Sequence, residues 1–118
     1  ALVCIPHPFD TFGRSGLDIE ILEEIAEQID ILEVFNSRSP FASASTKSLM
    51  FAQKHGIPGS AGSDAHTPHE IGNAYVEMPE FNGKDEFLQA LAKGKIIGHR
   101  TSPIVHFASA WARLRKQF

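Results

Sequence analysis

The alternation of short apolar runs with helix-patterned segments is what most constrains the fold of this 118-residue chain. Runs rich in β-forming or small residues, typical of short strands, lie at 2–5, 31–35, 57–62, 74–78 and 96–98. Segments with helical spacing of apolar residues lie at 17–29, 45–55, 84–93 and 104–118. This β-α-β-α order predicts an α/β fold of mainly parallel strands joined by crossover helices.

Three polar residues follow successive predicted strands. His7 comes after the first run, Asn36 directly after the second and Asp64 after the third. Their spacing is about one βα unit, roughly 30 residues. Because the carboxyl ends of parallel strands meet at one edge of a sheet, we expect these three side chains to lie at a common rim.

The segment Gly-Ser-Asp-Ala-His at residues 62–66 carries the strongest local signal for metal binding. Asp64 and His66 leave a strand end two residues apart, and a carboxylate and an imidazole there can bind a divalent ion. The pattern equally allows Asp64 to cap a turn and His66 to lie on the surface. His7 is a third candidate ligand, because Pro8 favours an extended His7 that projects toward the same rim. An ordinary loop histidine is the alternative.

Together these segments resemble the later motifs of the polymerase and histidinol phosphatase (PHP) family of metal-dependent phosphoesterases. The shared features are the strand ending in His7-Pro8, the Glu-Val-Phe-Asn run ending at Asn36, and residues 62–66. The resemblance covers nearly the whole chain. It implies that residues 1–118 form the C-terminal portion of a distorted (βα) barrel, truncated at the N-terminus, an expectation that the apolar start of the chain also favours.

The resemblance also implies roles for the ligands. Asp64 and His66 would bind different ions of a cluster of up to three divalent metals, with Mn²⁺ or Zn²⁺ the expected ions, and His7 resembles the later isolated histidine ligand. A complete family member also has an N-terminal His-x-His motif, a bridging glutamate and further histidines, which this sequence lacks. Glu33, in mid-strand, and His55, at a helix end, do not replace them. We therefore expect a half-site that binds fewer ions or none by itself.

Substrate contacts are assigned to three polar residues near the strand ends. Arg14 and Arg38 could bind a substrate phosphate through paired hydrogen bonds, although solvated surface charge is the more ordinary interpretation. Asn36 could orient a substrate or simply end its strand. Cys4 is interpreted as a small buried hydrophobic residue. The pattern singles out no catalytic acid, base or nucleophile.

Composition narrows the class of partner. With 11 basic and 14 acidic side chains the net charge is −3, so we expect no stable binding to DNA or to an anionic membrane. One cysteine and the lack of a long apolar run indicate a cytoplasmic protein without a membrane span.

The expected substrate is a nucleotide, an oligonucleotide or a small phosphomonoester, and the open edges of a half barrel predict self-association. The alternatives are a non-catalytic binding module and a metal hydrolase of the amidohydrolase type, which acts at a carbon centre.

Overall fold

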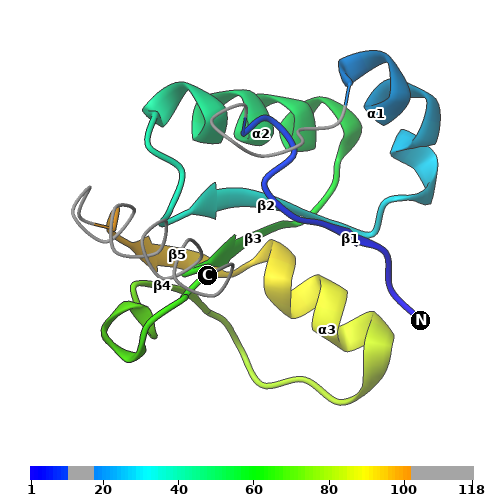
Figure 1. The fold of residues 1–118 in the computed structure, drawn as a ribbon. Coiled ribbons are helices and arrows are strands. Elements are labelled where there is room, and N and C mark those ends of the chain that lie inside the picture. The colour runs from blue at the N-terminus through cyan, green and yellow to red at the C-terminus, as the bar shows by residue number, and fades with distance from the viewer. Residues whose placement is uncertain (11–17, 102–118) are drawn as a thin grey trace, which may run out of the picture.

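The structure is a computed structural model that describes residues 1–10 and 18–101 (Figure 1). Its strands are β1 (Cys4–Ile5), β2 (Ile31–Asn36), β3 (Gly59–Gly62), β4 (Ala74–Glu77) and β5 (Lys95–Gly98). Its helices are α1 (Ile19–Ile25), α2 (Ala42–His55) and α3 (Gly83–Ala92), with short 3-10 turns η1 (Ala26–Gln28) and η2 (Pro68–Glu70). The predicted terminal helix at 104–118 and Arg14 lie outside the described residues.

The strands form two sheets. β1, β2 and β3 make a parallel sheet in that order, with α1 and α2 as the crossovers, which confirms the predicted α/β class. β4 and β5 pair antiparallel, with Ala74 opposite Gly98, so the expected parallel arrangement does not extend to them. Here α3 returns the chain alongside β4 instead of crossing over the sheet. Within residues 1–10 and 18–101 the strands do not close into a barrel.

Local sequence accounts for the helix ends. Asp18 caps α1, with its carboxylate accepting the Glu20 N–H at 3.1 Å, in keeping with the preference for Asp at this position. Gly56 ends α2 in the left-handed conformation at φ 64°, as its position after the helical pattern predicts. Asp18 thus marks where α1 begins, and Gly56 marks where the chain leaves α2 toward β3.

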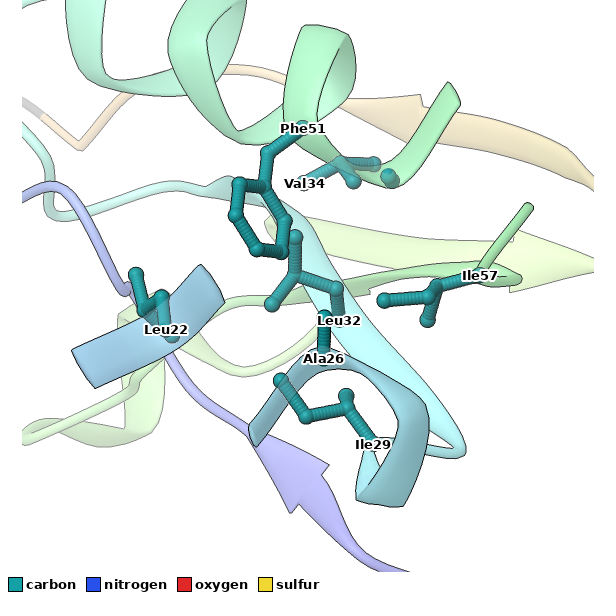
Figure 2. Packing of buried hydrophobic residues seen from close by; sticks show 8 residues of the cluster. Leu22, Ala26, Ile29, Leu32, Val34, Phe51 and Ile57 are labelled. Atoms are coloured by element: carbon teal, nitrogen blue, oxygen red, sulfur yellow. The ribbon is translucent and has the colours of Figure 1, made fainter. Parts of the chain in front are cut away.

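The core lies between α1, α2 and one face of the parallel sheet (Figure 2). Leu22 and Leu32 are fully buried there, and Phe51 packs against them from α2. Figure 1 shows α1 and α2 on one side of this sheet and α3 on the other. Full burial of each large side chain contributes about 1.5–3 kcal/mol, so this cluster stabilises the packing of α1 and α2 on the sheet.

The first strand departs from the expectation of a buried strand. Val3 is 46% exposed and Cys4 is exposed, so the interpretation of Cys4 as a buried hydrophobic residue is wrong. β1 is an edge strand: it pairs with β2, and no other described strand covers its second side. The apolar run therefore packs through Ile5, which lies against the core cluster.

Across the described ranges, no helix has the length and apolarity needed to cross a bilayer.

Candidate metal-binding site

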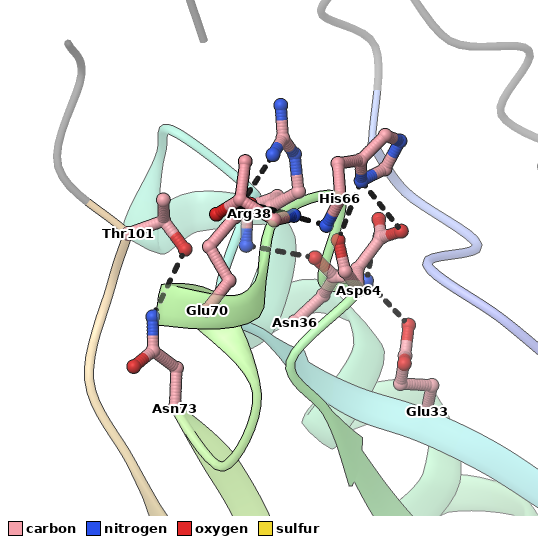
Figure 3. A network of polar contacts seen from close by, with 9 residues as sticks. Glu33, Asn36, Arg38, Asp64, His66, Glu70, Asn73 and Thr101 are labelled. Atoms are coloured by element: carbon pink, nitrogen blue, oxygen red, sulfur yellow. Dashed lines mark hydrogen bonds and ion pairs between the residues drawn. The ribbon is translucent and has the colours of Figure 1, made fainter. Parts of the chain in front are cut away.

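The parallel sheet brings the three predicted strand-end residues to one rim. His7 follows β1, Asn36 is the last residue of β2 and Asp64 follows β3. The expectation of a common rim is confirmed, because Glu33 bonds to both His7 and Asn36, and Asn36 bonds to Asp64. Figure 3 shows Glu33, Asn36 and Asp64 at this rim. Binding of metal at this rim stays a prediction.

Glu33 lies at the centre of this rim. Its Oε2 accepts the backbone N–H of His7 at 2.7 Å and the Nδ2 amide of Asn36 at 3.0 Å. The same amide group donates to Oδ2 of Asp64 at 3.3 Å. Glu33 and Asn36 together therefore tie the ends of β1, β2 and β3 to one another.

A β-bulge explains how Glu33 reaches Asn36. In a regular strand, residues three apart point to opposite faces. The pairing of β2 with β3 passes from Glu33 opposite Ser60 to Phe35 opposite Ala61, so Val34 is an extra residue in β2. A bulge of this kind turns the following side chains to the other face, which places Asn36 on the same side as Glu33.

Gly62 is the neighbour that makes room for the Glu33 carboxylate. A Cβ at position 62 would collide with Oε1 of Glu33, so there is a steric reason for glycine at this position, two residues before Asp64. Gly62 lies in β3, and its φ is not in the left-handed region. Glycine is therefore required here by the space available and not by the backbone conformation.

Two of the candidate ligands have a strained backbone. In the part of the chain that the structure describes, His7 (φ 29°) and Asp64 (φ 50°) are the non-glycine residues with positive φ. The expectation that Pro8 keeps His7 extended is therefore wrong: the His7 carbonyl accepts the Asp10 N–H at 3.2 Å, which closes a turn. Such conformations cost about 1–3 kcal/mol each and cluster at functional sites.

His66 is oriented by Asp64. Nδ1 of His66 lies 2.7 Å from the Asp64 carbonyl oxygen, which can only accept, so Nδ1 carries the proton. In the neutral ring Nε2 then keeps its lone pair, which is the state required of a metal ligand. The His66 side chain is 46% exposed and that of Asp64 is 24% exposed, so both are accessible to an ion.

Arg38 and Glu70 form a buried pair beside these ligands. Their side chains are 3% and 2% exposed, and Nη1 of Arg38 donates to Oε1 of Glu70. The interpretation of Arg38 as solvated surface charge is therefore wrong. Burial alone would raise the pKa of Glu70, but hydrogen bonds from Thr67, the His66 N–H and Arg38 hold that pKa below its ordinary value. Contact of Arg38 or Asn36 with substrate stays a prediction.

The sequence interpretation did not assign a site role to Glu33 or Glu70. For Glu70 a signal exists: Thr67-Pro-His-Glu70 has the spacing of a capping box, with proline at its first helical position. For Glu33 the sequence gives no such pattern. A regular strand would place the Glu33 side chain on the face opposite Asn36, and only the bulge at Val34 brings the two together.

The set of potential metal ligands around His7 is incomplete. Nδ1 of His7 is buried and has no hydrogen-bond partner among the described residues, and His7 lines a cavity of about 10 Å³, roughly the room of one water molecule. Nowhere in residues 1–10 and 18–101 do three or more His, Cys, Asp or Glu side chains converge to hold a metal. The donors suit Mn²⁺ or Zn²⁺ in type, but the described donors fall short in number.

Comparison with known proteins identifies this region. Residues 42–96 match the family model described as PHP-associated, and this range includes Asp64, His66 and Glu70. The resemblance to the PHP family is thus confirmed over residues 42–96.

A relative of undefined function extends the similarity. An uncharacterized protein of Methanocaldococcus jannaschii is 40% identical to the chain over 85 residues. The match covers 70% of this chain and 36% of that protein, so the chain spans about a third of its relative's length.

Proposed function

We propose that this chain supplies part of the divalent-metal site of a phosphoester hydrolase, within the C-terminal portion of a distorted barrel of the PHP type. The observation that carries the proposal is the placement of His7, Asp64 and His66 at one rim of a parallel sheet, with Asp64 and His66 inside the range that matches a PHP-associated model. The other ligands would come from parts of the protein outside residues 1–10 and 18–101.

Each ligand has a distinct task in this proposal. The Asp64 carboxylate and Nε2 of His66 would bind ions, and His7 would contribute its imidazole from the end of β1. Bound Mn²⁺ or Zn²⁺ would lower the pKa of a water molecule and neutralise phosphate oxygens. Glu33 and Asn36 hold the ligands in place by the hydrogen bonds described above.

The substrate class follows from the same chemistry. A nucleotide, an oligonucleotide or a small phosphomonoester would present its phosphate to the metal rim, in a cytoplasmic setting. Arg14 is the better candidate for a phosphate contact from this chain, because the Arg38 guanidinium is buried and bonded to Glu70.

Substitution of Asp64 tests the proposal. In the intact protein, Asp64→Ala is expected to reduce bound Mn²⁺ and phosphoester turnover at least tenfold, because it removes a carboxylate ligand. Asp18→Ala is the matched control: it removes a helix cap, which costs about 0.5–2 kcal/mol of stability, and leaves metal content unchanged.

Metal content, turnover and thermal unfolding would be measured on the same preparations of each variant. Wild-type metal content and turnover in Asp64→Ala would refute the assignment. Hydrolysis of an amide substrate in place of a phosphoester would indicate the amidohydrolase alternative, and metal binding without any turnover would indicate a binding module.

A further inference from the structure

Glu70 is a buried carboxylate that the proposed metal chemistry does not use. The residue is 1% exposed and lies at the end of η2. It accepts hydrogen bonds from the His66 N–H (3.1 Å), the Thr67 N–H (2.8 Å), the Thr67 hydroxyl (2.9 Å) and Nη1 of Arg38. A carboxylate this buried is costly unless it is fully paired, so these bonds define one geometry for the surrounding chain.

The bonds connect two strand ends that are distant in sequence. Arg38 follows β2 and Glu70 lies 32 residues further along, beyond β3. The backbone N–H of Arg38 donates to Oδ1 of Asn36 at 2.9 Å, and Nδ2 of Asn36 donates to Asp64. A continuous path of hydrogen bonds therefore leads from Glu70 through Arg38 and Asn36 to the Asp64 carboxylate (Figure 3).

We propose that Glu70, paired with Arg38, is a positioning residue that sets the orientation of the His66 imidazole and the Asp64 carboxylate for metal binding. This inference rests on the proposed function for its metal-binding consequence. Glu70 fixes the His66 backbone at the N–H, while the Asp64 carbonyl fixes the ring at Nδ1. With both ends of the residue held, the direction of Nε2 is determined.

The burial of Arg38 and Glu70 favours a positioning role for this pair over direct contact with substrate. The Arg38 side chain is 3% exposed and its Nη1 donates to Glu70, so in this arrangement the guanidinium is directed at a buried carboxylate and is shielded from a substrate phosphate. Outer partners of this kind orient metal ligands, and their loss commonly weakens metal affinity by about 10–100-fold.

The test compares two Glu→Gln variants of the intact protein. Glu70→Gln keeps the size of the side chain and removes its charge, whereas Glu23→Gln makes the same change at a half-exposed glutamate on α1 that pairs with Lys54. Mn²⁺ affinity would be measured by titration calorimetry. The ¹⁵N spectrum of the metal-free protein would report which His66 ring nitrogen carries the proton.

We expect Glu70→Gln to bind Mn²⁺ about 10–100-fold more weakly and to lose the preference of His66 for the proton on Nδ1. Glu23→Gln should match the wild type in both measurements. A folded Glu70→Gln with wild-type Mn²⁺ affinity and an unchanged His66 spectrum would overturn the inference.

The two readouts separate this inference from the proposed function. If the wild-type protein binds no Mn²⁺ but the His66 spectrum changes in Glu70→Gln, the metal site fails and the positioning role stands. If Glu70→Gln does not fold, Thr67→Val removes one of the four bonds to Glu70 with little change in shape. That variant should weaken Mn²⁺ binding about threefold to tenfold, and unchanged affinity with an unchanged His66 spectrum would reject the inference.

Discussion

Replacing Gly62 by alanine would place a methyl group where the Glu33 carboxylate lies. The carboxylate must then shift, and its Oε2 holds the two bonds from the His7 N–H and Nδ2 of Asn36. The backbone of position 62 accepts alanine, since its φ is not in the left-handed region. The cost of Gly62→Ala is therefore expected to act through Glu33.

The size of the effect follows from those two bonds. A hydrogen bond to a charged group contributes about 1.5–3 kcal/mol, so loss of both sets a ceiling of about 3–6 kcal/mol. Glu33 is half-buried, and water can replace part of what is lost. We expect Gly62→Ala to lower the free energy of unfolding by about 2–4 kcal/mol.

A double-mutant cycle measured by urea unfolding tests this reasoning. In a Glu33→Ala background the obstructing carboxylate is absent, so adding Gly62→Ala should cost less than about 1 kcal/mol. The two substitutions should then couple by about 1–3 kcal/mol. Additive effects, within about 0.5 kcal/mol, would show that the glycine is required for some other reason.

The remaining predictions concern pH and association. Because the pKa of Glu70 is lowered on folding from its ordinary 4.5, its contribution is complete above pH 4.5 and is lost as pH falls through the lower folded-state pKa. The difference in unfolding free energy between wild type and Glu70→Gln should therefore be constant near neutral pH and shrink in acid. Urea unfolding at several pH values measures this difference, and a difference that grows in acid would contradict the prediction. We also expect self-association through the exposed edge of β1, where Val3 is 46% exposed, and sedimentation that shows a monomer at all concentrations would reject it.

Local pattern was sufficient to predict the rim that carries the candidate ligands. Parallel strands joined by crossover helices run in the same direction, so residues that follow their carboxyl ends meet at one edge of the sheet. His7, Asn36 and Asp64 do so for this reason. The Gly56 helix end was likewise predictable, because only glycine commonly adopts that conformation.

Features that depend on pairing partners were not predictable from local pattern. The bulge at Val34 arises only when β2 pairs with β3, and it alone brings Glu33 to the side of Asn36. The burial of Arg38 depends on Glu70, which lies 32 residues away. The antiparallel pairing of β5 with β4 follows from the path of α3, since strand patterns carry no direction.

The positive φ angles of His7 and Asp64 lower the stability of the fold at the rim where the proposed site needs these two side chains. Glycine would relieve the strain at either position, at the loss of the side chain that the proposed site needs. Related proteins that are not under selection for metal binding would gain stability from glycine or asparagine at these two positions. The identity of residues 7 and 64 is thus a marker of whether related proteins still use this rim.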